Sequence, residues 1–134
     1  MENSLLFWQG IRVEGYANES QSNPKQGSLS MEEGCTVEYA KIGILAGHEK
    51  FSGYGGGIVD VRDSKIKDCP VSMRFEEYVA TDGVGTEIFN EAVVRNMNFT
   101  WTAQLSQFEY FNPDVHVDII NSSGIRLRGN TYQN

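Results

Sequence analysis

The sequence has few of the residues on which disulfide-rich and metal-binding domains depend. Its 134 residues include two cysteines and two histidines. Cys35 and Cys69 can form one bridge at most, so a disulfide framework is excluded and two buried free thiols are the expected arrangement. Neither His48 nor His116 stands at a zinc-like spacing from a cysteine. The sequence therefore predicts no metal site and no cofactor.

Long apolar runs are missing as well. A helix that spans a membrane needs about 18 consecutive apolar residues, and no stretch of this chain comes near that length. The first ten residues, MENSLLFWQG, carry an acid at position 2 and no basic segment, so they do not form a signal peptide. No membrane insertion is predicted, and the chain is expected to be either cytosolic or an exported protein whose signal has been removed.

Basic residues are in deficit. Eleven Lys and Arg residues stand against eighteen Asp and Glu residues, which gives a formal net charge of −7 and an isoelectric point near 4.7. A chain with this charge repels the phosphate backbone, so nucleic acid is not expected as a partner. With 40% hydrophobic residues, the chain is long enough for one core and too short for two. We therefore expect a single domain over residues 1–134.

A repeated motif is the strongest pattern that is present. It consists of two apolar residues around one other residue, then four residues, then a third apolar residue. Three copies lie 33 residues apart, and an earlier copy lies 30 residues upstream with one extra residue in its turn. The copies are Leu29/Met31/Val37, Val59/Val61/Ile66, Ala92/Val94/Phe99 and Ile125/Leu127/Tyr132. The segment WQGIRVEG is interpreted as a partial copy that forms a cap or a first incomplete coil.

The motif has a direct structural interpretation. Side chains alternate between the two faces of a strand, so the first two apolar residues point inward together. The polar segments RDSK, RNMN and RGNT then supply residues that tolerate turns and left-handed backbone. A second short strand follows with the third apolar residue. A chain that turns in this way at a constant period stacks like residues on like residues, which predicts a parallel β-solenoid of about four coils.

The rest of each period is expected to hold a third strand and a loop. Alternating apolar residues at 42–44 and 71–75 predict the third strands, and a further alternation at 115–119 has a less regular place in the pattern. The Gly-rich segments 46–57 and 76–87 are interpreted as loops that leave the coil, and such insertions often form a binding face. Two rival folds are an amphipathic helix over residues 86–97 and a β-sandwich or jelly roll. Neither accounts for the repeated motif.

The segments WQGIRVEG, GSLSMEEGCTVEYAKIGI, GGGIVDVRDSKIKDCPVSM and GIRLRGNTYQN resemble the repeats of right-handed parallel β-helix proteins of the pectate-lyase-like superfamily. The resemblance covers the chain from Trp8 to its end, apart from the loops, and is strongest to surface or secreted proteins of bacteria. It implies an all-β, right-handed parallel β-helix, an extracellular or cell-surface location and polysaccharide as the ligand class. Because that superfamily holds lyases, hydrolases, adhesins and tailspikes, the resemblance implies no catalytic residue.

Three groups of residues are candidate ligand contacts. Arg62 and Arg95, with Arg128, stack beside Glu32 at the corner, where they could bind a sugar carboxylate or form a solvated charge ladder. The segment PDVHVDII is expected to place three polar side chains on the outer face of one strand, either as a site or simply as an exposed face: Asp114, His116 and Asp118. Aromatic residues that could stack on sugar rings or pack loops form the third group: Trp101, Tyr110, Phe108 and Phe111, with Phe51 and Tyr54 in the first Gly-rich loop.

Taken together, these features favour a non-catalytic module that is structural, carbohydrate-binding or both. The alternative is a polysaccharide lyase or glycoside hydrolase that uses outward carboxylates and arginines. Carboxylates gathered in one groove with a nearby Arg or Lys would favour the enzyme, and exposed aromatics along a groove would favour binding. Open solenoid ends also predict self-association, unless the chain is a fragment of a longer β-helix.

Overall fold

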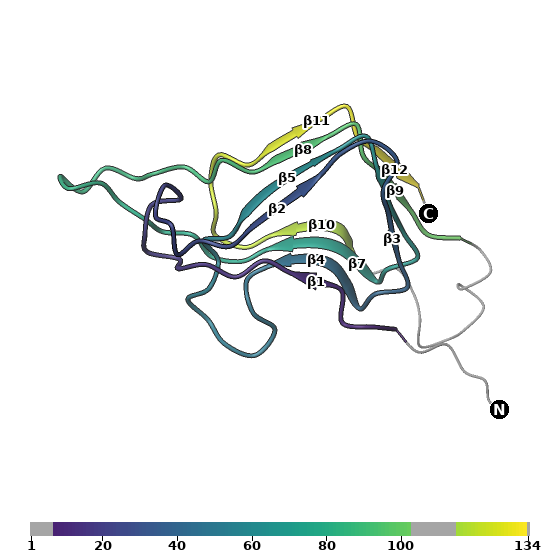
Figure 1. Ribbon diagram of the computed structural model, residues 1–134, viewed down its shortest axis with the longest axis horizontal. Helices are drawn as coiled ribbons and strands as arrows, with labels where there is room; N and C mark the ends of the chain where they lie inside the picture. The colour runs from purple at the N-terminus through teal and green to yellow at the C-terminus, as the bar shows by residue number, and fades with distance from the viewer. Residues whose placement is uncertain (1–6, 103–114, 134) are drawn as a thin grey trace.

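The computed structural model describes residues 7–102 and 115–133 (Figure 1). All regular secondary structure in this part of the chain is β-strand. The strands are β1 (Ile11–Arg12), β2 (Ser28–Met31), β3 (Thr36–Glu38), β4 (Ile42–Ala46), β5 (Ile58–Arg62), β6 (Lys65–Lys67), β7 (Val71–Phe75), β8 (Val93–Arg95), β9 (Asn98–Thr100), β10 (Val115–Ile119), β11 (Arg126–Arg128) and β12 (Thr131–Gln133).

The strands form three parallel sheets. The first sheet has the order β1-β4-β7-β10, the second β2-β5-β8-β11 and the third β3-β6-β9-β12. The chain visits the sheets in rotation, so it winds as a parallel β-solenoid, as the sequence predicts. It makes about three turns where four coils were expected, because four visits to a sheet are joined by three complete turns.

The register of the repeated motif is confirmed residue by residue. Val61 lies between Met31 and Val94, and Leu127 lies on the other side of Val94. In the third sheet, Ile66 pairs with Val37 and with Phe99. The side chains of Val61, Val94, Ile66 and Phe99 are all fully buried. Burial of each such side chain stabilises the fold by roughly 1.5–3 kcal/mol, which makes the stacked inward columns the core of the solenoid.

The corner between the second and third sheets is built from left-handed residues at equivalent positions. Asp63 has φ 51°, Asn96 has φ 55° and Gly129 has φ 68°. Asp, Asn and Gly adopt this conformation at lower cost than other residues. The backbone N–H of Asp63 donates to the carbonyl of Arg95 over 3.0 Å, and that of Asn96 donates to the carbonyl of Arg128 over 2.9 Å. The corners thus continue the inter-strand hydrogen bonding around the bend.

The predicted third strands also form. Ile42 pairs with Val71 and Ile44 with Met73, so β4 and β7 are neighbours, and β10 extends the same sheet beyond β7. The interpretation of WQGIRVEG as a partial copy of the motif is wrong. Ile11 pairs with Ile44, which places β1 in the first sheet rather than beside β2.

A helix over residues 86–97 does not form. Val93–Arg95 is strand β8, and Phe89, which a helix would have turned toward the core, is 59% exposed. Pairing of Val94 with Val61 and Leu127 on its two sides outweighs the local helical spacing of apolar residues.

The segments that connect first-sheet strands to second-sheet strands are loops, and they lie together at the left of Figure 1. We call this part of the molecule the loop side. Gln21 ties the loops together. Its side-chain Nε2 donates to Asn90 Oδ1 over 3.2 Å, and its Oε1 accepts from the N–H of Glu91 over 2.8 Å. Gln21 and Asn90 are 6% and 1% exposed. The loop side is therefore fixed by buried hydrogen bonds rather than by strand pairing.

The two cysteines are free and differ in burial. Cys69 is buried, and this burial raises the pKa of its thiol to about 11. Cys35 is exposed, so the expectation of two buried thiols is wrong for this residue. In the described part of the chain, no helix is long and apolar enough to cross a membrane.

Candidate functional site

A row of aromatic rings lies on the loop side. Phe51 and His48 have ring centroids 4.7 Å apart, His48 and Tyr54 5.8 Å, and Tyr54 and Tyr16 6.4 Å. Phe51 is 59% exposed and Tyr16 is 43% exposed. We call these four residues the aromatic row. It combines one ring from the loop after β1 with three from the loop after β4.

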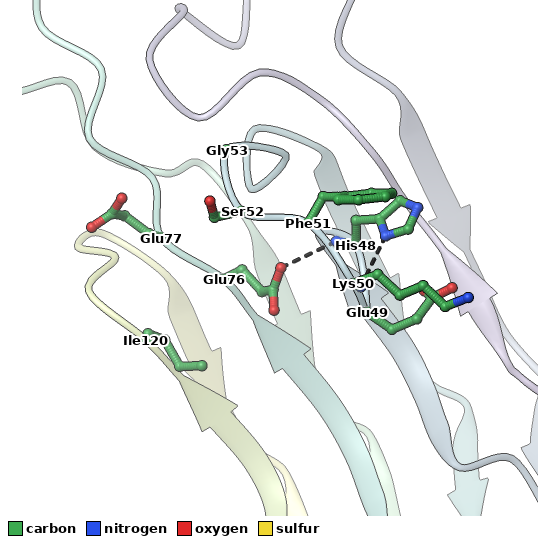
Figure 2. A pocket seen from close by; sticks show the side chains of 9 residues that line it. All are labelled: His48, Glu49, Lys50, Phe51, Ser52, Gly53, Glu76, Glu77 and Ile120. Atoms are coloured by element: carbon green, nitrogen blue, oxygen red, sulfur yellow. Dashed lines mark hydrogen bonds between the residues drawn. The ribbon is translucent and has the colours of Figure 1, made fainter.

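A pocket of about 280 Å³ lies at the Phe51 end of the aromatic row (Figure 2). Its walls come from the loop after β4 and from the ends of β7 and β10. The lining residues are His48, Glu49, Lys50, Phe51, Ser52, Gly53, Glu76, Glu77 and Ile120. The pocket thus brings an exposed aromatic ring together with three carboxylates and one ammonium group.

Glycine allows the loop after β4 to approach the end of β7. A Cβ atom at Gly47 would lie 2.3 Å from Glu76 Oε1, and one at Gly55 would lie 2.1 Å from the carbonyl oxygen of Glu77. Glu76 Oε1 accepts a hydrogen bond from the backbone N–H of His48 over 3.1 Å, and Glu77 Oε2 accepts one from Asn121 Nδ2 over 2.7 Å. Close backbone packing therefore positions both carboxylates.

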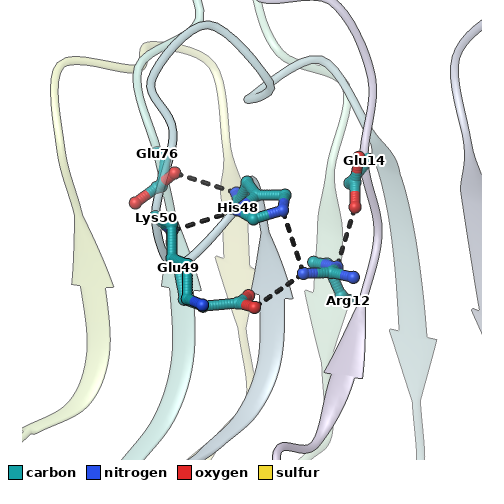
Figure 3. Close-up of polar contacts among 6 residues, drawn as sticks. All are labelled: Arg12, Glu14, His48, Glu49, Lys50 and Glu76. Carbon is teal, nitrogen blue, oxygen red and sulfur yellow. Dashed lines mark hydrogen bonds and ion pairs between the residues drawn. The ribbon is translucent and has the colours of Figure 1, made fainter.

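Arg12 links the same loop to β1 (Figure 3). Its Nε lies 2.7 Å from Glu14 Oε2, and its Nη1 lies 2.7 Å from Glu49 Oε1 and 3.1 Å from His48 Nε2. The side chains of Arg12 and its two carboxylate partners are 37–41% exposed. Ion pairs between exposed side chains contribute little to stability, so this cluster orients the loop more than it stabilises the fold.

Both ring nitrogens of His48 face hydrogen-bond donors. Nδ1 accepts from the backbone N–H of Lys50 over 3.0 Å, while Nε2 faces the guanidinium of Arg12. A neutral imidazole has one acceptor nitrogen, and Arg donates only. One of the two contacts is therefore a hydrogen bond in each tautomer, and that hydrogen bond orients the ring.

The carboxyl group of Glu49 is stabilised in its charged form. A hydrogen bond from its own backbone N–H lowers its pKa, and Arg12 lowers it further by a hydrogen bond and by its charge. A general acid needs the opposite shift, because it must hold its proton near neutral pH.

A second, more polar pocket of about 450 Å³ lies beside β2 and β5 at the corner. Its lining residues are Ser30, Glu32, Glu33, Asp60, Arg62, Asp63 and Arg95. Arg62 Nε donates to Asp60 Oδ1 over 2.7 Å, and this hydrogen bond together with the charge of Asp60 raises the pKa of Arg62. Arg95 pairs in register with both Arg62 and Arg128. The predicted arginine column exists, and Asp60 neutralises one of its members.

Trp101 is 3% exposed, so its ring is not available to a ligand. Of the two alternatives that the sequence leaves open for this residue, packing within the chain is therefore the one observed. Asp118 points outward as predicted, and its Oδ2 accepts from Arg74 Nε over 3.0 Å. Tyr110 and Asp114 lie outside the described residues, as do Phe108 and Phe111.

His116 does not share the outer face with Asp118. Its ring centroid lies 6.2 Å from that of the buried Phe99 and 5.9 Å from that of Tyr132. It stands level with Ser72 of β7, which is 1% exposed. The alternation of side chains between the inner and outer faces therefore fails at the second residue of β7 and β10. At this position the side chain turns toward the third sheet, because the residue lies next to the corner.

Sequence reasoning missed Tyr16, Glu76 and Glu77 as members of the site. The position of Glu76 could have been predicted from the strand register. Ala46 pairs with Phe75, so the next residues of the two strands, Gly47 and Glu76, also lie side by side. Tyr16 lies in an irregular loop, and no pattern in the repeat places it beside Tyr54.

Among the described residues, no group of three or more His, Cys, Asp or Glu side chains is arranged to hold a metal ion. The chain matches no protein-family model, no curated protein and no solved structure. Function is therefore inferred from the geometry of the two pockets and the aromatic row.

Proposed function

We propose that the protein is a non-catalytic, carbohydrate-binding β-helix module that acts outside the cell or at the surface of a bacterium or phage. It belongs, in this proposal, with right-handed β-helix proteins of the pectate-lyase-like type. The observation that carries the proposal is the aromatic row, which is solvent-exposed at both ends and borders a pocket lined by carboxylates.

Aromatic rings and carboxylates are complementary to a neutral sugar. The apolar face of a pyranose stacks on rings such as Phe51 and Tyr16, which present flat, exposed surfaces. Glu76 and Glu77 each accept one hydrogen bond from the protein and retain lone pairs for sugar hydroxyl groups. The net charge of −7 opposes an acidic glycan. Neutral polysaccharide is therefore the favoured ligand class.

The polar groups of this pocket support binding rather than hydrolysis. The lowered pKa of Glu49 keeps that carboxylate ionised, and Arg12 is shared between two acids. The carboxylate of Glu76 receives a backbone N–H, which holds it in place. Such groups fix a ligand's orientation without supplying a proton to a leaving oxygen.

A glycan array followed by titration calorimetry tests the proposal. We expect binding to one or more neutral glycans, and replacement of Phe51 by Ala should weaken it about tenfold, since a ring stacking interaction contributes about 1 kcal/mol or more. Phe89→Ala is the matched control, because Phe89 is also 59% exposed but lies outside the aromatic row and the pocket. Equal loss in both variants, or no neutral glycan bound at all, would contradict the proposal.

A second candidate function rests on the corner pocket. Glu32, Glu33, Asp60 and Asp63 line it together with Arg62 and Arg95, which is the combination that a polysaccharide lyase or hydrolase uses. Assays on acidic and neutral polysaccharides test this candidate. Turnover that disappears in Arg95→Ala and survives in Phe51→Ala would favour the enzyme over the binding module.

A further inference from the structure

The last coil exposes side chains that its neighbours bury. Leu127 and Tyr132 occupy inward columns of the solenoid, yet they are 42% and 47% exposed. Val94 and Phe99, one coil earlier in the same columns, are 0% exposed. In the described part of the chain, β10, β11 and β12 also end their sheets (Figure 1). This end therefore combines an apolar surface with open strand edges, which favour pairing.

The opposite end differs. Met31 and Val37 hold the equivalent inward positions in the first coil, and each is only 6% exposed. A head-to-tail stack would place the exposed Leu127 and Tyr132 of the last coil against inward columns that are already covered at the other end. Contact between two last coils instead buries exposed apolar surface on both sides. Such a contact is isologous and closes as a dimer.

In such a dimer, a two-fold axis perpendicular to the solenoid axis relates the two copies. One strand of the last coil then pairs with the same strand of the copy, and each of the other two strands lies along the other strand of the copy. If β11 paired with itself, Arg126 would face Arg128 of the second copy, and like charges in opposite positions are destabilising. If β12 pairs with itself, the neutral residues Thr131 and Gln133 face each other and Tyr132 meets its own copy.

Self-pairing of β12 also brings opposite charges together. It places β10 of one copy along β11 of the other. The outward residue Asp118 of β10 then faces the arginines that flank Leu127 in β11 of the second copy. Figure 1 shows the first and second sheets as the two long sides and the third sheet at the closed end, so an axis through the third sheet exchanges sides of similar size.

We propose that this face is a homodimer interface, in which β12 pairs antiparallel with its copy and Asp118 of β10, which also accepts from Arg74 of its own chain, lies against Arg126 and Arg128 of β11 in the copy. The interface is independent of the aromatic row, which lies on the loop side. The dimer carries two glycan-binding surfaces if the function proposed above is correct, and its existence does not depend on that function.

Sedimentation velocity of the full chain over a concentration series tests the interface. We expect a monomer-dimer equilibrium, with Leu127→Lys and Tyr132→Lys weakening dimerisation at least tenfold. Val84→Lys is the control, because Val84 is 87% exposed in the loop after β7 and belongs to no strand. Circular dichroism verifies that each variant stays folded. A monomer at every concentration, open-ended oligomers, or dimers unaffected by both core-end variants would overturn the proposal.

Charge reversal tests the arrangement itself. Asp118→Arg alone and the double variant Arg126→Glu/Arg128→Glu alone should each be monomeric, since each places like charges at both junctions. An equimolar mixture of the two should form a heterodimer, because both junctions then carry opposite charges again. Failure of the mixture to associate while the wild-type chain dimerises would overturn the proposed pairing.

Discussion

The corner side and the loop side of the solenoid achieve order by different means. At the corner, Asp63 and Asn96 adopt the same left-handed conformation and pass their backbone hydrogen bonds to the next coil. On the loop side, Gln21 and Asn90 hold irregular segments together through side-chain hydrogen bonds. The regular side sets the stacking of the coils, whereas the irregular side gathers aromatic rings and carboxylates into a pocket. The stacked core and the pocket thereby lie in different parts of the molecule.

The sharpest way to break this division is to remove a stacked core ring. Phe99→Ala should lower the free energy of unfolding by about 3–5 kcal/mol, because Phe99 is fully buried between Ile66 and Tyr132. Urea unfolding measures the change. Phe51→Ala, which removes the same side chain from the exposed loop, should change it by less than about 1 kcal/mol. A similar decrease in the free energy of unfolding in both variants would show that the loop side contributes as much to stability as the core.

A smaller effect is expected from the hydrogen-bonded hub of the loops. Gln21→Ala leaves the N–H of Glu91 without a partner and removes one of the two hydrogen bonds that Asn90 Oδ1 accepts, which should cost about 1–3 kcal/mol. Amide hydrogen exchange should accelerate in residues 47–57 and 76–92 and remain slow in β5 and β8. Gln9→Ala, at an exposed position before β1, is the control. Acceleration spread evenly over strands and loops would contradict a separate loop unit.

The smallest effect concerns the two thiols. In the native protein, Cys35 should react with a thiol reagent at once, and Cys69 should react only on unfolding. Burial raises the pKa of Cys69 to about 11, so the folded chain retains a proton that the unfolded chain releases from pH 9 upward. Stability from this residue is complete below pH 9 and declines as pH rises toward 11. The difference in unfolding free energy between wild type and Cys69→Ala should shrink over this range, and a constant difference would refute the shift.

The stacking of the coils could be predicted from the sequence, because equivalent residues of the repeated motif contact one another in successive coils. Spacing alone identified Val61 and Val94 as neighbours, and Ile66 and Phe99 likewise. The same reasoning failed for His116, because strand alternation does not describe a residue at a corner. It also failed to place Tyr16, since loops have no period. The arginine column was predicted at Arg62 and Arg95, but the ion pair of Arg62 with Asp60 depends on rotamers that no spacing reveals.

The matched level of Arg62 and Arg95 has a consequence for the evolution of this chain. The 33 residues that separate them begin and end at the same point of neighbouring coils. A tandem duplication of this segment would add a rung whose upper and lower surfaces already fit their neighbours. Length is therefore a property that such a protein can change in whole steps, by recombination between its own repeats, while each loop remains free to diverge.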